Sequence, residues 1–135
     1  MIMKVIVCLE KKLGILFNHR RLSKDRKVVE DICKRTKRLY MSPFSEPLFC
    51  DALIEICVDE QFLEKAHAGD VCFVENQLLE SYVDKIEELV VYQWNRSYPS
   101  DTKFDIPLQE WKKISEEDFV GFSHEKITRQ VYVRG

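Results

Sequence analysis

A basic segment of the sequence ends at a carboxylate, and together these side chains could bind an anion and handle a proton. His19, Arg20, Arg21 and Lys24 directly precede Asp25. Guanidinium and ammonium groups bind phosphates and carboxylates, and a helix beginning here would add free backbone N–H donors. We therefore expect an anionic small molecule to bind beside these residues, although a solvated basic loop has the same composition.

Charge is distributed unevenly along the chain. Residues 1–38 contain twelve Lys or Arg and four acidic residues, a charge of +8; the remainder contains nine and nineteen, a charge of −10, so the whole chain carries −2. A basic half is typical of proteins that bind phosphates or nucleic acids, and it is also typical of a solvated helix face. Both interpretations stay open at this point.

Composition indicates one globular domain. The chain has 135 residues, 45% of them hydrophobic and 33% charged, which is enough to bury a core, and we expect one domain over residues 1–135. No apolar run approaches the ~20 residues that a membrane-spanning helix needs. The opening MIMKVIVCLEKK has neither a basic leader nor a small-residue cleavage site, so we expect a cytoplasmic protein without a membrane partner.

The cysteines and histidines do not form a recognisable metal or nucleophile motif. No CxxC pair and no HExxH sequence occurs, so we expect no metal site. Ser123, His124 and Glu125 are consecutive, and consecutive side chains do not point at one another as a catalytic triad requires. The cysteines are odd in number and mostly lie in apolar runs, where we expect them to pack as small apolar side chains: Cys8, Cys33, Cys50, Cys57 and Cys72.

Strand and helix patterns alternate over the first part of the chain. Apolar, β-rich runs predict strands at 2–9, 39–41, 53–58 and 70–74. Helical spacing and capping residues predict helices at 24–36, 42–50 and 76–82, and another that starts at Asp59. Ser23 and Ser42 are the expected N-caps of the first two helices, and residues 11–21 are expected to form a loop.

After residue 88 the alternation stops. Three long strands are predicted at 89–94, 111–119 and 126–133, the last two as an antiparallel hairpin. This order predicts an α/β fold: a single domain with a mostly parallel central sheet flanked by helices and an antiparallel C-terminal hairpin. The apolar strand at 89–94 is a candidate for an exposed sheet edge.

Several segments, taken in order, resemble the dihydrofolate reductase family. SDTKFD at 100–105, followed by Trp111 and VYVR at 131–134, is similar to the family's closing Gly-Asp-Thr-x-Phe-Pro segment, tryptophan and final hairpin. Upstream, VIVCLEKKLGILFN resembles the first strand and its Gly-Ile-Gly-x-Asn loop, and LSKDRKVVEDI resembles a Leu-Pro-x-Asp-Leu helix start. RLYMSPFSEPLF is similar to the strand and helix that carry Met-Gly-Arg-x-Thr. The resemblance implies a shortened, divergent dihydrofolate reductase-like fold.

The resemblance also assigns a role to Asp25. This residue aligns with the family's catalytic carboxylate, which contacts the pterin ring and assists protonation before NADPH delivers a hydride. A carboxylate in an apolar cleft can have a raised pKa suited to that work. The alternative is an ordinary acid in the first turn of a helix. Together with the basic segment, Cys8 and Tyr92 complete the set of expected ligand-binding residues.

The cofactor positions depart from the family pattern. Val74-Glu75-Asn76 stands where the family has glycines that let the backbone approach a pyrophosphate, and Glu75 would repel phosphate. Pro43 and Ser45 replace the arginine and threonine of Gly-Arg-x-Thr. We therefore expect no cofactor, and NADPH only if the protein is an active reductase.

Three functions follow from these features. The first is a ligand-binding protein that holds a small anionic or heterocyclic molecule, a nucleotide or a pterin, in a remnant cleft. The second is an active NAD(P)H-dependent reductase of a pterin-like substrate. The third is a module that binds RNA or single-stranded DNA, in which aromatic side chains would stack on bases: Tyr40, Tyr92, Trp94 and Tyr98. The sequence does not determine the oligomeric state.

Overall fold

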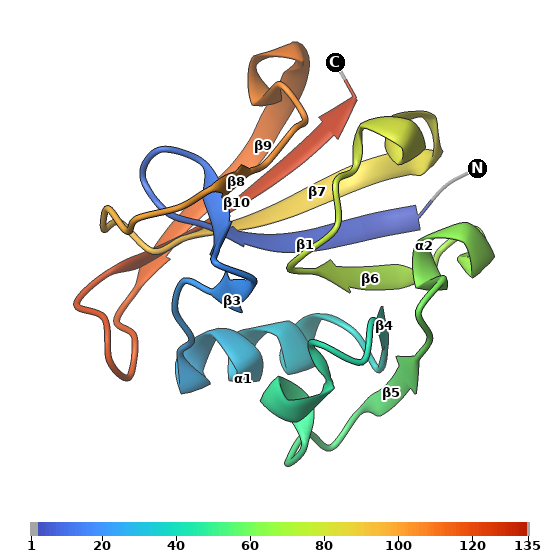
Figure 1. Ribbon diagram of the computed structural model, residues 1–135, viewed down its shortest axis with the longest axis horizontal. Helices are drawn as coiled ribbons and strands as arrows, with labels where there is room; N and C mark the ends of the chain where they lie inside the picture. Colours follow the sequence, from blue (N-terminus) through green and yellow to red (C-terminus); the bar gives the residue numbers. More distant parts are fainter. Residues whose placement is uncertain (1–2, 135) are drawn as a thin grey trace.

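A computed structural model describes residues 3–134, which form a large and a small β-sheet (Figure 1). The large sheet has the strand order β5-β4-β6-β1-β7-β10-β9. Its strands are β1 (Met3–Leu9), β4 (Arg38–Met41), β5 (Glu55–Val58), β6 (Val71–Val74), β7 (Ile86–Gln93), β9 (Trp111–Phe119) and β10 (Ile127–Arg134). Strands β5, β4, β6, β1 and β7 are parallel to one another. Strand β10 pairs antiparallel with β7, and β9 pairs antiparallel with β10, as the sequence predicts.

The helices are fewer and shorter than the sequence predicts. The α-helices are α1 (Arg26–Arg35) and α2 (Phe62–Lys65), and the 3₁₀ segments are η1 (Glu46–Phe49), η2 (Glu80–Lys85) and η3 (Leu108–Glu110). The helix predicted at 76–82 is wrong in place and type, because η2 begins later and is 3₁₀. The helix predicted at 42–50 shrinks to η1 because Pro47 cannot donate to an α-helical ladder.

Two predicted N-caps are wrong. The N-cap of α1 is Asp25, whose carboxylate accepts a hydrogen bond from the N–H of Lys27, rather than Ser23. The residue preceding η1 is Ser45 rather than Ser42. Asp is as good an N-cap as Ser, so sequence alone could not choose between Ser23 and Asp25.

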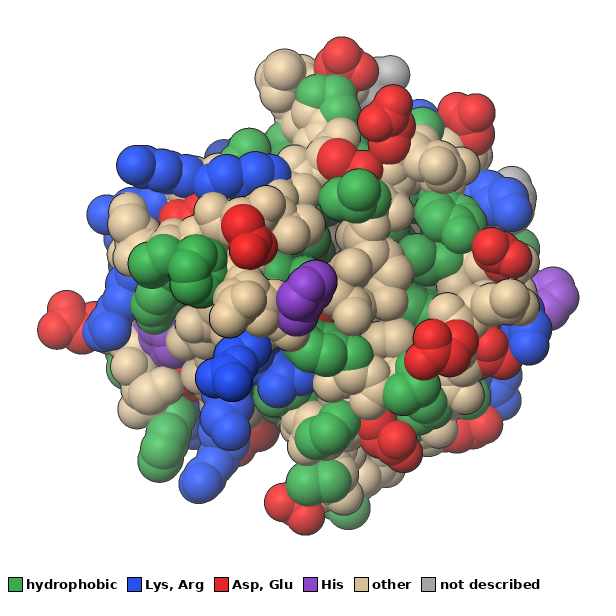
Figure 2. Space-filling model, in the orientation of Figure 1, with side chains coloured by type: hydrophobic (Ala, Val, Ile, Leu, Met, Phe, Trp, Pro, Cys, Tyr) green, Lys and Arg blue, Asp and Glu red, His purple; other side chains and the backbone are tan. Residues whose placement is uncertain are grey.

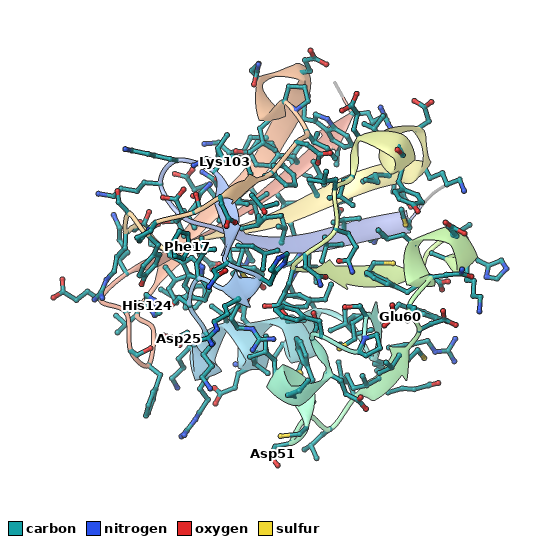
Figure 3. The ribbon with its side chains drawn as sticks, viewed as in Figure 1. Phe17, Asp25, Asp51, Glu60, Lys103 and His124 are labelled. Atoms are coloured by element: carbon teal, nitrogen blue, oxygen red, sulfur yellow. The ribbon has the colours of Figure 1, made fainter. Side chains whose placement is uncertain are left out.

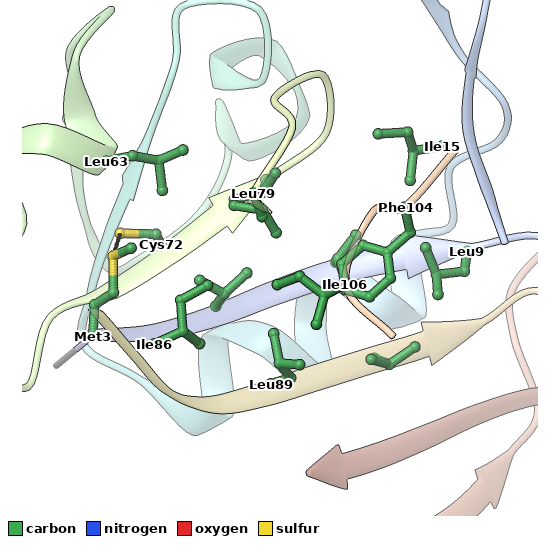
Figure 4. Packing of buried hydrophobic residues seen from close by; sticks show 14 of the residues in the cluster. Met3, Leu9, Ile15, Leu63, Cys72, Leu79, Ile86, Leu89, Phe104 and Ile106 are labelled. Atoms are coloured by element: carbon green, nitrogen blue, oxygen red, sulfur yellow. Dashed lines mark hydrogen bonds between the residues drawn. The ribbon is translucent and has the colours of Figure 1, made fainter. Parts of the chain in front are cut away.

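Two apolar clusters cover the two faces of the large sheet. Successive residues of β1 pack into different clusters, because successive side chains of a strand point to opposite faces of the sheet. Val5 and Val7 belong to one cluster with Phe104 and Ile106 of the segment before η3. Figure 4 shows Phe104 and Ile106 beside Leu9 of the same strand. On the other face, Ile6 packs in one cluster with Val28 and Ile32 of α1, both buried.

The predicted loop at 11–21 contains a second sheet. Its strands are β2 (Gly14–Phe17), β3 (Arg20–Arg21) and β8 (Thr102–Lys103), in the order β3-β2-β8. Asn18 and His19 both have positive φ angles, 51° and 61°, as the central residues of a tight two-residue hairpin do. The Asp101-Thr102 turn therefore pairs with the N-terminal half of the chain: the N–H of Asn18 donates to the Asp101 carboxylate.

The expected edge strand lies inside the sheet. β7, which contains residues 89–93, pairs with β1 on one side and β10 on the other, so that expectation is wrong. The edges of the large sheet are β5 and β9. No helix among the described residues is long and apolar enough to cross a membrane.

Candidate functional site

A groove of about 920 Å³ runs along the outer side of α1. Residues 47–53, which include most of η1 and the turn after it, form the opposite wall, and the loop between β9 and β10 closes one end. In Figure 3, Asp25 and His124 lie together at that end, and Asp51 lies on the opposite wall. The groove thus lies between two segments that follow β3 and β4 in the chain.

The groove combines an apolar floor with cations at its rim. Val29 and Cys33 of α1 face Leu48 and Ala52 across it, and all four are half-buried. The cations are exposed: Lys24, Arg26 and Lys34. Glu30 and Asp51 are the exposed acids at the rim, and Glu30 has Lys27 3.6 Å away. A flat apolar molecule that carries a negative charge would match this lining.

One of the residues that line the groove is a solvent-exposed aromatic side chain. Phe122 is 63% exposed, and the guanidinium of Arg26 lies 4.4 Å from the centre of its ring. Arginine stacked on an aromatic ring keeps hydrogen-bond donors free at its edge. The pair could therefore contact both the ring and the anionic group of a ligand.

Asp25 lies at the end of this groove, but its carboxylate is already hydrogen-bonded to donors within the protein. The side chain is fully buried and accepts hydrogen bonds from the N–H groups of Lys27, Phe122 and Ser123, at 2.8 Å in each case. His124 Nδ1 lies 2.8 Å from its Oδ2. The carboxylate thus joins the start of α1 to the β9–β10 loop.

These bonds decide the ionisation of Asp25. Burial alone would raise the pKa of this carboxyl, but donation from Phe122, His124, Ser123 and Lys27 outweighs it and holds the pKa well below its usual value. The raised pKa that the resemblance implies is therefore wrong. A proton-donating role for Asp25 stays a prediction, and a carboxylate that remains ionised at neutral pH does not favour it.

Gly121 allows the loop to come this close. A Cβ at this position would lie 2.7 Å from Asp25 Oδ2 and 2.9 Å from the carbonyl oxygen of His124. The N–H of Gly121 also donates to that carbonyl, which closes the tip of the loop. A glycine beside the Phe122-Ser123-His124 run is the one sequence signal that could have pointed to this contact.

The basic segment does not act as one cluster. His19 in the turn of the β2–β3 hairpin and Arg20 at the start of β3 are exposed, and neither lines the groove. Of the predicted cations, Lys24 alone lines it, next to Asp25. Figure 2 shows Lys and Arg side chains over the left half of this face.

Arg21 forms an ion pair with a carboxylate of the protein itself. Its Nε and Nη2 donate to the two oxygens of Glu75 at 2.9 and 3.0 Å, and Nη2 also donates to the carbonyl of Phe44. Ser45 Oγ donates to the same carboxylate at 2.7 Å. Glu75 thus occupies the donors that an external anion would need here.

The last two predicted contacts are the strand residues Cys8 and Tyr92. Tyr92 is fully buried and its hydroxyl donates to Asp31 at 2.6 Å. Its ring is therefore not accessible to a small ligand or to a nucleic-acid base. Arg129 donates twice to the same carboxylate. Cys8 is half-buried, and burial, with a contribution from Glu75, raises the pKa of its thiol. Neither residue lines the groove.

Sequence reasoning missed most of the groove. It did not identify Val29, Leu48 and Phe122, because an apolar residue on a helix or loop carries no chemical signature of binding. Among residues 3–134, no group of three or more His, Cys, Asp or Glu side chains is arranged to hold a metal ion.

The fold is that of dihydrofolate reductase. No protein-family model matches the chain, and a search of curated proteins found no match. A search of solved structures found the dihydrofolate reductase from Enterococcus faecalis, complexed with NADP(H) and RAB-propyl, at a TM-score of 0.71. The superposition covers 99% of this chain and 96% of that one, with 12% sequence identity. The likeness establishes a divergent dihydrofolate reductase-like fold.

Proposed function

We propose that the protein binds a small anionic heterocyclic molecule, a nucleotide or a pterin, in the groove beside α1. The observation that carries this proposal is the pairing of an apolar floor with the free cations Lys24, Arg26 and Lys34 at the rim. A ring system would bury apolar surface against Val29 and Leu48, and its carboxylate or phosphate would meet Arg26.

The proposal includes the loss of NADPH binding. Arg21 and Ser45 donate hydrogen bonds to the carboxylate of Glu75. Glu75 is an internal anion at a position where the family resemblance leads us to expect a glycine. A cofactor phosphate would have to displace this carboxylate and would be repelled by it. A thermal shift produced by NADPH, together with NADPH oxidation in the presence of dihydrofolate, would instead indicate an active reductase.

A thermal-shift titration tests the groove. Dihydrofolate, methotrexate and a panel of nucleotides are added, because a ligand that binds only the folded protein raises the melting temperature. Val29→Trp, which fills the groove, and Arg26→Ala, which removes a rim cation, should each abolish or reduce the shift. Arg20→Ala also removes an exposed cation, but one outside the groove, and should leave the shift unchanged.

The outcomes separate the remaining functions. A shift that survives Val29→Trp would place the ligand elsewhere and refute the groove. If no small molecule produces a shift, salt-sensitive binding of RNA or single-stranded DNA is measured next. Saturable binding of a nucleic acid would then replace the small-molecule proposal.

A further inference from the structure

Three side chains from two distant segments are connected in the order of a catalytic triad. Ser23 Oγ lies 2.9 Å from His124 Nε2, and His124 Nδ1 lies 2.8 Å from Asp25 Oδ2. Figure 3 shows Asp25 and His124 side by side near the start of α1. A nucleophile within hydrogen-bond reach of a base, with the base oriented by a third group, is the arrangement that activates serine.

The protonation pattern follows from the partners. The ionised carboxylate of Asp25 can only accept a hydrogen bond, so Nδ1 of His124 carries the proton. Nε2 of a neutral His124 is then an acceptor and faces the hydroxyl of Ser23. The low pKa of Asp25 keeps its negative charge available to stabilise the imidazolium that forms if His124 takes up a proton.

The imidazole is held rigidly. Its side chain is 3% exposed, and Trp94 stacks on it with ring centres 4.6 Å apart and planes 24° apart. Asp25 in turn is fixed by three backbone N–H donors. A base held by a stacked ring and a hydrogen-bonded carboxylate keeps its alignment toward Ser23, and such positioning lowers a barrier.

We propose that Ser23 is the nucleophile of an acyl-transfer site that cleaves small carboxylic esters, with His124 as general base and Asp25 as positioning residue. Ser23 Oγ bonds to the ester carbonyl carbon while its proton passes to His124 Nε2. The bond to the leaving oxygen then breaks, and His124 returns the proton to that oxygen as the alcohol departs. Water attacks the acyl-Ser23 carbonyl by the same route, which releases the acid and restores the serine.

Tyr98 supplies a donor for the negative charge that develops. Its hydroxyl lies 3.2 Å from His124 Nε2 and 3.5 Å from Ser23 Oγ. When the serine oxygen attacks, this O–H can turn to the carbonyl oxygen, and tyrosine is one of the side chains that serve as oxyanion donors. Tyr98 and Ser23 are both half-buried, so a small ester would reach the pair from solvent.

The site is next to the groove and does not depend on it. Ser23 does not line the groove, whereas the adjacent Lys24 and Asp25 do. The exposed ammonium of Lys24 favours esters whose acyl part carries a separate, ionised carboxylate. Failure of every ligand in the thermal-shift titration would leave the chemistry of Ser23 intact.

Covalent labelling of the whole chain tests the proposal. The protein is treated with diisopropyl fluorophosphate, whose phosphorus bonds to an activated serine oxygen as fluoride and the serine proton leave. Intact-mass measurement and peptide mapping then identify the modified residue. We expect one adduct, on the peptide containing Ser23, and none in Ser23→Ala. Release of 4-nitrophenolate from 4-nitrophenyl acetate should fall in the same variant.

Three further variants separate chemistry from folding. His124→Gln should slow labelling by about 10²-fold, the usual contribution of a general base, and a melting curve checks that this variant is folded. Ser115→Ala and His67→Gln change exposed residues outside both sites and should label at the wild-type rate. An adduct elsewhere, no adduct at all, or an unchanged rate in a folded His124→Gln would refute the proposal.

Discussion

His124 Nδ1 lies 2.8 Å from Asp25 Oδ2, although 99 positions separate the two residues in the chain. The pair ties the N-cap of α1 to the loop between β9 and β10. Since strand order brings these two segments together, the contact reports on both the fold and the candidate chemistry. Several measurable properties depend on it.

Acid should destabilise the protein through Asp25. The pKa of this carboxyl is lower in the folded chain than its unfolded value of ~3.9, so its stabilisation is fully present above about pH 4. That stabilisation is lost as the pH falls from about 4 toward the folded pKa. The melting temperature of the wild type should therefore decrease over this range.

Asp25→Asn is the matched variant for this prediction. It keeps one acceptor oxygen and loses the charge, so it should be less stable at pH 7 by about 1–3 kcal/mol. Its melting temperature should depend less on pH below 4 than that of the wild type. Glu10, a buried carboxyl whose pKa is also lowered, titrates in both proteins and cancels in the comparison. Parallel pH curves for the two proteins would contradict the assignment.

Gly121→Ala should weaken the docking of the loop. The added methyl group would lie 2.7 Å from both Asp25 Oδ2 and a methyl of Ile127, so the loop must move away. We expect a loss of about 1–3 kcal/mol in urea unfolding, as for other overpacked sites. Gly69→Ala is the comparison, because no atom lies within 4 Å there and only its φ of +86° opposes alanine. A loss at Gly121 no larger than that at Gly69 would argue against the contact.

The Arg21–Glu75 pair should be energetically coupled. The two side chains are 25% and 9% exposed and share two hydrogen bonds, so a double-mutant cycle of Arg21→Ala and Glu75→Ala should give about 1–2 kcal/mol. The exposed pair Arg38–Glu55 is the control and should show no measurable coupling. Equal coupling in the two cycles would mean that Glu75 does not hold Arg21.

Cysteine reactivity should follow burial. Cys50 is exposed and should react first with iodoacetamide at pH 8. Burial raises the pKa of the Cys72 thiol to about 12, and it raises the pKa of Cys8 as well, so these two thiols should resist until the protein unfolds. Peptide mapping at successive times gives the order. Early modification of Cys72 would show that β6 opens readily.

Local pattern determined much of the fold. The apolar run that became β1, the strand at 111–119 and the helix beginning near Asp25 are all visible in residue spacing, which is set by the two-residue and 3.6-residue periods of strand and helix. The order of these elements also predicts the mostly parallel sheet with its antiparallel hairpin, which the structure confirms.

Only the tertiary structure decided which residues the ionisable side chains hydrogen-bond to. Sequence placed His124 beside Ser123 and Glu125, and the fold placed it between Ser23 and Asp25. Arg21 looked free to bind an anion until Glu75, 54 positions away, took its donors. Local periodicity says which way a side chain faces along its own element. Which distant group it meets depends on the order in which the strands pair, and that order is a property of the whole chain.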